Sequence, residues 1–396
     1  MHMSQPSNAS SRPLRAIRND AVILEAATRL AAAEGWSGLL FPRVAADAGL
    51  SIRPLHERFD DRESLAADLW RLRLVSEIVP ALANVVAAIH GNGPEALDEA
   101  LQRFSQPSIP LQAASELLMV AATSPDLFAG VRADLGGHLD SWLSPRPRLL
   151  TRAEAARNAF GIAVALGLLI AARRYPSRDV NLTAYATELW CAMQKRLAPA
   201  KLPSRIAEHL DVAINFGTDD PAWEKLLNAT VVTVGQLGYE RATVTVISEA
   251  AGFTKGLLFR RYETKRDLFL DATRRMSASS MEANLAFQHA VSQEYSPGIA
   301  GAVAIREFMR PGRELLRNIF LEQLRLAIHD PEIRASIDSE IDPVMTDEAA
   351  LMGASEQLIY VHTGQALANG VVQLQVLYPS AWNLPYDVVE RALAAD

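Results

Sequence analysis

The chain has 396 residues, of which 49% are hydrophobic and 21% are charged, and its formal net charge is −7. This balance excludes a disordered chain, and the length predicts two to four domains. A single cysteine, Cys191, excludes a disulfide framework and a zinc site built from several cysteines.

The sequence predicts no membrane span. Its longest apolar run, residues 159–172, has 14 residues, which is too short to cross a bilayer and is typical of a buried helix. The Ser-rich start has no apolar stretch behind a basic patch, so residues 1–17 are predicted to form a disordered arm rather than a secretory signal. We therefore expect a cytoplasmic protein.

Helical patterns run through the whole chain. Alanine and leucine are abundant, and apolar residues recur at the i, i+3, i+4 spacing of an amphipathic helix, which predicts an all-α fold. The best strand candidates are residues 231–234 and 244–247, but the first continues a helical stripe that begins after Asp220–Pro221. Beyond the first three helices of each half, the expected helices cover about 64–90, 94–104, 110–123, 125–143, 150–174 and 181–197, and then about 266–293, 298–309, 311–329, 331–341, 345–377 and 384–395.

A shift of 203 residues aligns the sequence with itself. The matched pairs include Gly35 with Gly238, residues 48–50 with 251–253, and residues 175–176 with 378–379. We therefore interpret the chain as two similar halves of about 200 residues. The predicted domains are a disordered arm (1–17), a first helix-turn-helix (HTH) domain (18–63), a first helical domain (64–197), a linker (198–220), a second HTH domain (221–265) and a second helical domain (266–396).

The segment from Thr243 to Leu268 has the pattern of a helix-turn-helix. Thr243 would cap a short helix, Gly252 would allow a tight turn with positive φ, and Thr254 would cap a second short helix. The start of that second helix is basic and predicted to be exposed, which is typical of a helix that enters the major groove of DNA.

On these residues the sequence resembles the tetracycline-repressor-like (TetR) family of bacterial regulators. The resemblance rests on Gly238–Tyr239, Thr243–Val244, Ile247–Ser248, Ala251–Gly252, Phe259, Tyr262 and Lys265. In the first half the matching residues are Ala48–Gly49, Ser51, Leu55, Phe59 and Leu65, whereas Leu40, Pro42, Pro54, His56 and Arg62 depart from the pattern. Phe259 also replaces the usual tyrosine of the recognition helix.

The resemblance implies two tandem TetR-like units, each an HTH domain followed by a helical ligand-binding and dimerisation domain. It implies a ligand-responsive repressor that binds a double-stranded DNA operator and an unknown small-molecule effector. Because both copies share one chain, we expect an intrachain pseudo-dimer, in which helices 150–174 and 345–377 pair through Gly161, Ala165, Gly167, Gly364, Ala368 and Gly370. Whether two such chains pair again stays open, as does the operator sequence.

The residues expected to contact DNA are Thr243, Thr254, Lys255, Gly256, Leu257, Phe259, Arg260 and Lys265 in the second half, and Arg43, Ser51, Arg53, His56 and Arg62 in the first. The candidates for an effector pocket are Phe104, Met119, Trp142, Phe160, Phe308, Phe320, Tyr360 and His362, and for each of them plain helical core is the favoured alternative. No metal site or cofactor is expected.

Local charge is compatible with DNA binding. Residues 12–73 carry a net charge of +1 and residues 221–275 carry +3, which leaves −11 for the rest of the chain. Basic charge is therefore concentrated in the two HTH domains.

Two other classes of function stay open. A helical small-molecule-binding or interaction protein, in which one or both HTH domains have decayed, is favoured by the departures at Leu40, Pro42 and His56. A helical enzyme is the more distant alternative, since the sequence has no Gly-x-Ser-x-Gly, His-Glu-x-x-His or phosphate-binding glycine loop.

Overall fold

A computed structural model describes residues 14–91, 93–146, 149–174, 182–194, 214–295, 297–339 and 357–383. Within these ranges the chain is helical and contains no β-strand, apart from an isolated bridge between Arg146 and Leu150. The predicted all-α fold is therefore confirmed. Residues 14–17 of the predicted disordered arm are helical, so the arm was predicted too long at its end. The rest of the arm, most of the linker and the helix expected over 384–395 lie outside the described residues.

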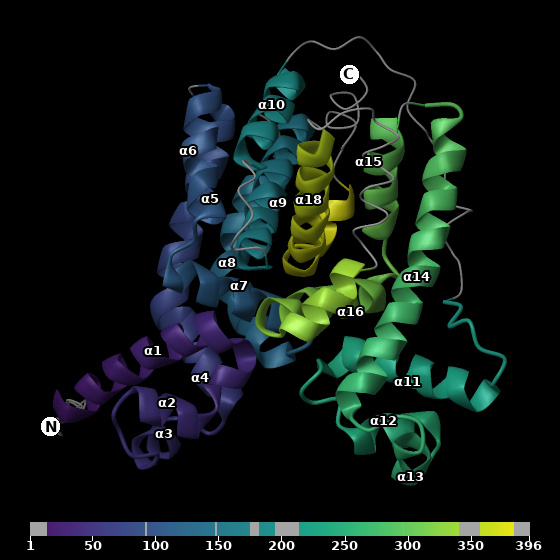
Figure 1. Cartoon of the computed structure of the whole chain (residues 1–396). Coiled ribbons are helices and arrows are strands. Elements are labelled where there is room, and N and C mark those ends of the chain that lie inside the picture. Colours follow the sequence, from purple (N-terminus) through teal and green to yellow (C-terminus); the bar gives the residue numbers. More distant parts are fainter. Residues whose placement is uncertain are drawn as a thin grey trace, which may run out of the picture.

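The first half contains ten α-helices within the described ranges (Figure 1). They are α1 (Leu14–Glu34), α2 (Phe41–Asp47), α3 (Arg53–Arg58), α4 (Arg62–Leu69), α5 (Val75–His90), α6 (Pro94–Ser105), α7 (Ile109–Ala121), α8 (Pro125–Leu143), α9 (Arg152–Arg174) and α10 (Leu182–Gln194). A 3₁₀ turn, η1 (Gly35–Leu39), follows α1, and a π-helical turn, η2 (Trp70–Leu74), joins α4 to α5.

The described part of the second half is also helical. Its helices are α11 (Pro221–Leu237), α12 (Val244–Ala251), α13 (Lys255–Phe259), α14 (Lys265–Ser292), α15 (Pro297–Phe308), α16 (Glu314–His329) and α18 (Gln357–Leu377). Residues 331–339 are also helical, and a 3₁₀ turn, η3 (Pro379–Asn383), follows α18. Both strand candidates of the sequence are thus helical, in α11 and α12.

One long helix differs from its prediction. The sequence predicts a continuous helix over about 64–90, whereas the structure inserts the π-helical turn η2, in which the amide of Val75 donates to the carbonyl of Trp70. Such a turn accommodates one extra residue in a helix. The corresponding helix of the second half, α14, runs without this interruption.

Helices α9 and α18 cross at the centre of the molecule, and glycines make the close approach possible (Figure 1). A Cβ built on Gly167 would lie 1.7 Å from the carbonyl oxygen of Ala366, and one on Gly370 would lie 1.6 Å from that of Ala163. Any side chain at either glycine would collide with the main chain of the opposite helix. Of the other small residues expected here, Gly161 instead faces Ile89 of α5, because it lies on a different side of α9.

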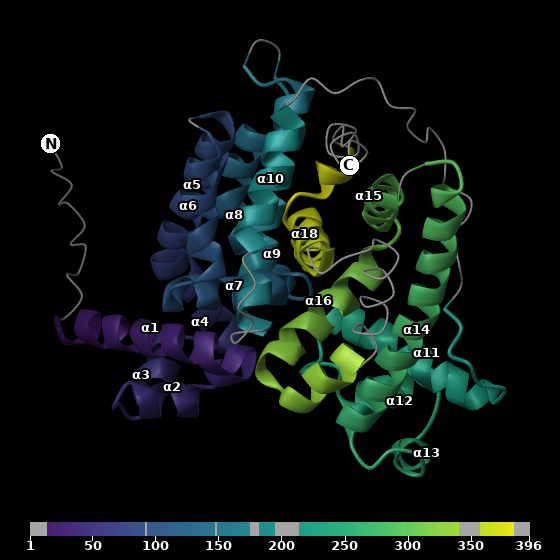
Figure 2. The same ribbon diagram turned by 45° about the horizontal axis from the view of Figure 1, so that its top comes forward.

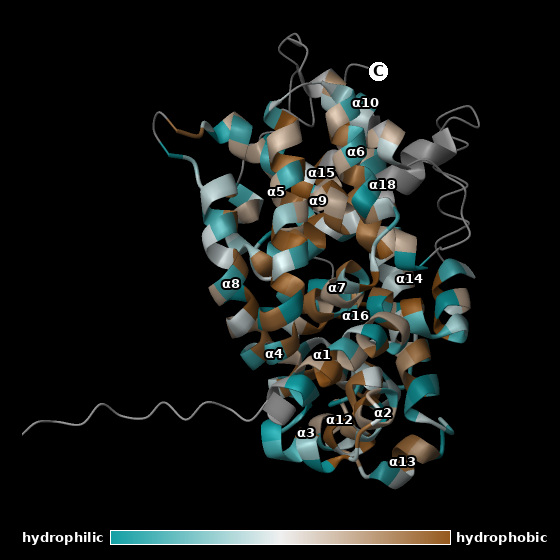
Figure 3. Cartoon of the chain, turned by 90° about the vertical axis from the view of Figure 1, so that its left-hand side faces the viewer, coloured by the Kyte–Doolittle hydropathy of each residue, from teal (hydrophilic) through white to brown (hydrophobic). Residues whose placement is uncertain are grey.

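The apolar side chains of the described residues are buried in several separate clusters. Figure 3 shows hydrophobic residues concentrated in the inner helices, α7 and α9 among them, with hydrophilic residues on outward turns. Two helical stretches, Arg62–His90 and Arg152–Arg174, are long and apolar enough to span a membrane by length and composition. The apolar window of the second is 83% buried inside the protein, as expected for the core helix predicted from the sequence.

Candidate nucleic-acid interface

The helix cap and the glycine turn that the sequence predicts for the second HTH domain are both present in the structure. The hydroxyl of Thr243 accepts a hydrogen bond of 3.3 Å from the amide of Val246 and so caps α12. Gly252 ends that helix with a φ of +70°, a conformation that favours glycine. Ile247 and Leu258 are fully buried between the helices. Together these features fix the angle at which α13 leaves α12.

The outer face of α13 carries the side chains expected to contact DNA. Lys255 and Arg260 are exposed, and neither forms an ion pair with other residues in the described ranges. Leu257 and Phe259 are also exposed, Phe259 to 51%, and Figure 3 shows this hydrophobic colour on α13 at the end of the molecule. Exposed cations next to apolar side chains are suited to phosphates and to base edges such as the thymine methyl group.

Thr254 is exposed and occupies the N-cap position of α13, but its hydroxyl makes no capping hydrogen bond there. Thr254 is therefore the N-cap residue that the sequence predicts, but the capping hydrogen bond does not form. Helix α13 has only five residues, so a capping bond would stabilise few helical hydrogen bonds. The Thr254 side chain is exposed instead.

A hydrogen-bond network around Tyr262 fixes the chain directly after α13. The hydroxyl of Tyr262 accepts from Trp223 Nε1 at 2.7 Å and donates to Asp271 at 2.6 Å, so it joins α11 to α14. Burial and the bond to Asp271 raise the pKa of Tyr262 well above its ordinary value, which keeps the hydroxyl protonated. The guanidinium of Arg261 lies over the Trp223 ring and pairs with Asp220 at 2.6 Å.

Helices α2 and α3 of the first half are likewise two short helices joined by a turn with a positive-φ glycine. Gly49 makes the turn between α2 and α3 with a φ of +64°, and Leu55 is fully buried beneath α3. Leu40 occupies the N-cap position of α2 without a capping side chain, and Pro54 lies in the first turn of α3, where its missing amide costs no helical hydrogen bond.

Several of the cations expected to contact DNA in the first HTH domain have partners within the protein. The side chain of Arg53 is 84% exposed but pairs with Glu57 of the same helix at 2.6 Å. Arg43 pairs with Glu34. Ser51 and His56 are exposed, and the His56 ring lies edge-on to Phe41 at 5.1 Å. The exposed face of α3 is thus less basic than that of α13.

At the start of the fourth helix, the two halves place a cation over an aromatic ring. Arg62 lies 4.4 Å from the centroid of Trp36, and burial lowers its pKa. Lys265 lies 3.9 Å from the centroid of Tyr239 and donates to the Tyr239 carbonyl at 2.8 Å, and burial lowers its pKa as well. Both cations therefore anchor the end of the first helix of their HTH domain, in addition to any contact with DNA.

The two recognition helices, α3 and α13, lie at the same end of the molecule (Figures 1 and 2). Helix α1 lies above α3, and α11 lies above α12 and α13, so neither recognition helix is covered by the helical domains.

Residues 226–272 match the family described as bacterial regulatory proteins, tetR family. The match begins in α11, includes all of α12 and α13, and ends in α14. This segment therefore resembles the DNA-binding domain of tetR-family regulators, which supports DNA binding and regulation of transcription as the general role of the chain. No curated protein matches the chain.

The candidates for an effector pocket divide into three groups. Phe104, Trp142 and Phe160 pack in the core of the first half. Met119, Phe308 and Phe320 meet in a separate apolar cluster between α7 and α16, in which the two phenyl rings lie 6.0 Å apart. The side chains of Tyr360 and His362 lie outside the described residues. The six candidates whose side chains are described therefore lie in two separate apolar clusters rather than around one pocket.

Sequence reasoning missed a group of buried charged residues between the halves. Glu116 of α7 is 0% exposed, and Glu322 and Arg325 of α16 are each 2% exposed. The available signal was a glutamate within the apolar stretch of α7, followed 206 residues later by another in α16. These residues contact the chain at the ends of α1 and α11.

Proposed function

We propose that this chain is a ligand-responsive transcriptional repressor that binds its operator as a single-chain pseudo-dimer of two tetR-like units. The observation that carries the proposal is a pair of reciprocal contacts at the crossing of α9 and α18. Gly167 meets Ala366, and Gly370 meets Ala163. Each residue of the first contact is 203 positions from its counterpart in the second, which is the signature of a twofold, self-complementary interface.

Local details repeated at the same offset support a common origin of the two halves. Before α4, Ser64 donates its amide to Asp61 at 2.8 Å, and Asp61 donates its amide to Ser64 at 3.2 Å. Before α14, Thr264 and Asp267 exchange the same two hydrogen bonds, at 3.0 and 3.1 Å. A reciprocal cap with its two residue types exchanged is better explained by duplication than by chance.

The repressor role and the response to a ligand extend the family match. An effector of small apolar or amphipathic character would bind in one or both helical domains, and the protein would act in the cytoplasm without catalysing a reaction. Release from DNA requires that this effector bind more tightly to the conformation that cannot dock both recognition helices.

The two HTH domains are proposed to contribute unequally. Lys255 and Arg260 of the second domain are exposed, whereas Arg53 of the first is paired with Glu57. Because phosphate contacts dominate affinity, the second domain should supply the larger share of the binding free energy. The operator would then consist of two different half-sites.

A gel shift at stated salt tests the proposal. The purified chain is titrated against duplex DNA from upstream of its own gene, and the mass of the complex is measured in solution. We expect one chain per operator, with binding lost in a Lys255→Ala/Arg260→Ala double variant. Arg103→Ala, which removes an exposed cation from α6 in the helical domain, is the matched control and should bind like the wild type.

Two results would contradict this proposal. Absence of binding to the upstream fragment, and to any duplex selected from a random-sequence pool, would refute the DNA-binding function. A complex that requires two chains for each operator would refute the single-chain arrangement while leaving DNA binding intact.

A further inference from the structure

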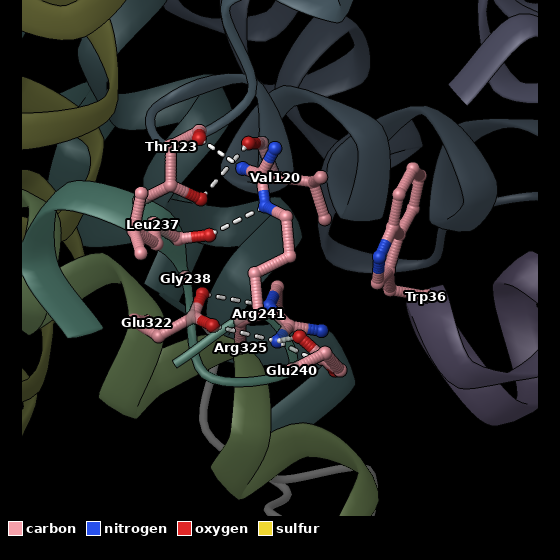
Figure 4. A pocket seen from close by; sticks show the side chains of 9 residues that line it. All are labelled: Trp36, Val120, Thr123, Leu237, Gly238, Glu240, Arg241, Glu322 and Arg325. Carbon is pink, nitrogen blue, oxygen red and sulfur yellow. Dashed lines mark hydrogen bonds and ion pairs between the residues drawn. The ribbon is translucent and has the colours of Figure 1, made fainter. Parts of the chain in front are cut away.

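A cluster of buried charged residues lies where the two halves meet. It contains Glu116 of α7, Arg173 of α9, and Glu322 and Arg325 of α16, and the partly exposed His329 of α16 lies beside them. Figure 4 shows Arg325 between Glu322 and Glu240, beside a cavity of about 10 Å³ that has room for about one water molecule. Buried charges of this kind are retained only where other charges and hydrogen bonds compensate for the loss of water.

Each glutamate of the cluster holds the end of the first helix of one HTH domain. Glu116 accepts from the Trp36 amide at 2.8 Å, directly after α1. Glu322 accepts from the Tyr239 amide at 2.5 Å, directly after α11. These amides follow helix ends where the chain turns sharply, so the two carboxylates fix the orientation of the HTH domains relative to α7 and α16.

Arg325 joins the two carboxylates through one guanidinium group. Its Nη1 donates to Glu116 at 3.0 Å, and its Nε and Nη2 donate to Glu322 at 2.9 and 2.8 Å. Nη2 also donates to Glu240, which follows α11, at 2.9 Å. A planar guanidinium imposes fixed directions on its hydrogen bonds, so this side chain sets the separation of its partners more strictly than a lysine would.

Further contacts cross between the halves around this link. His329 Nε2 of the second half lies 2.9 Å from Glu116 and 3.1 Å from Arg173 Nη2, both of the first half. A Cβ on Gly35 would lie 2.5 Å from His329, and one on Gly238 would lie 2.8 Å from the Thr123 hydroxyl. The end of each first helix is therefore packed against the opposite half of the chain.

We propose that Arg325 is a positioning residue that fixes the distance between the two recognition helices, and thereby the half-site spacing that the protein accepts. This inference rests on the proposed two-domain DNA binding. Removing Arg325 leaves three carboxylates near one another with less positive charge between them. The HTH domains then separate or move independently, although each keeps its own fold and its own contacts to DNA.

A distance measurement without DNA tests the positioning role. Spin labels are attached at Asp60→Cys and Glu263→Cys, two exposed positions of the HTH domains outside the proposed DNA contacts, in a Cys191→Ser background. The wild type should give one narrow distance distribution, and Arg325→Met should give a broader one with a shifted mean. Arg325→Met with the wild-type distribution would overturn the proposal.

A matched control separates positioning from general destabilisation. Arg317 is also on α16 and 2% exposed, but it donates to the carbonyls of Phe308 and Arg310, within the second half only. Arg317→Met should lower stability without changing the distance distribution. If Arg325→Met does not fold, the charge-compensated variant Arg325→Met/Glu322→Gln replaces it, because glutamine can still accept from the Tyr239 amide.

A second arm uses DNA. Duplexes selected by the wild type from a random-sequence pool are altered by adding or removing one base pair between the half-sites. The wild type should lose at least about tenfold in affinity with each change, since simultaneous docking requires one geometry, whereas Arg325→Met should lose less than about threefold. Retention of the wild-type spacing preference in Arg325→Met would overturn the inference. If the wild type selects no DNA, the proposed function fails, and the distance measurement still decides whether Arg325 positions the HTH domains.

Discussion

The crossing of α9 and α18 allows a quantitative test of how the halves are held together. A Cβ on Gly167 would lie 1.7 Å from a main-chain oxygen of α18. Carbon–oxygen contacts are normally about 3.3 Å, so Gly167→Ala must separate the helices by about 1.5 Å. Overpacking a core costs about 1–3 kcal/mol, and because the obstacle here is main chain we expect a loss near 3 kcal/mol in the free energy of unfolding. Gly370→Ala should cost about the same, since it makes the reciprocal contact.

Urea and thermal unfolding followed by circular dichroism measure this effect. A loss of about 3 kcal/mol should lower the midpoint temperature by roughly 4 °C for a chain of this length. The Gly167→Ala/Gly370→Ala double variant should lose much less than the sum, because one separation of the helices accommodates both methyl groups. Gly136→Ala in α8 is the control: its Cβ meets open space, so it should gain about 0.4–1 kcal/mol. Wild-type stability of Gly167→Ala, or strict additivity of the pair, would refute the reasoning.

Three further predictions concern acid stability, salt dependence and helix caps. Burial alone would raise the pKa of Glu116, but the hydrogen bond from His329 and the nearby positive charges hold that pKa well below its ordinary value. The ionised Glu116 therefore stabilises the folded protein at pH values above the unfolded carboxyl pKa of about 4.3, and this stabilisation is lost progressively as the pH falls below that value. In urea unfolding, the midpoint of Glu116→Gln should therefore drop less between pH 7 and pH 3.5 than the midpoint of the wild type. Arg260→Ala should weaken binding to all DNA sequences alike and reduce the slope of log affinity against log salt by about one. Fluorescence anisotropy measures this slope, and an unchanged slope would exclude a phosphate contact. Asp61→Ala and Thr264→Ala should each cost about 1 kcal/mol in urea unfolding, because they remove equivalent caps, and a loss confined to one of them would contradict that equivalence.

Much of the second HTH domain could be predicted from local sequence. Gly252 has the positive φ that the sequence predicts for the turn, and Gly238 at the end of α11 has a positive φ as well. The sequence predicts that a helix begins after Asp220–Pro221, and the Asp220 carboxylate accepts from the Ala222 and Trp223 amides at the start of α11. Turns and caps depend on residues within about four positions of one another, so a single sequence carries the whole signal.

Contacts between distant residues could not be predicted in the same way. The sequence predicts that Lys265 contacts DNA, and the structure adds the Tyr239 carbonyl as a partner that its position in the sequence does not reveal. Glu116 and Arg325 are 209 residues apart, and neither helix pattern indicates that one should be buried against the other. Small residues at helical spacing also predicted a crossing on α9 but did not distinguish Gly161 from Gly167.

The sequence by itself determined the helical fold, the ends of its helices and the turn of the second HTH domain, because those depend on side-chain period, main-chain conformation and short-range hydrogen bonds. Only the tertiary structure decided which glycines carry the helix crossing and which charges are buried together between the halves. Those choices depend on the relative rotation of helices and on the loss of water from groups far apart in the chain, and both exist only after the whole molecule has packed.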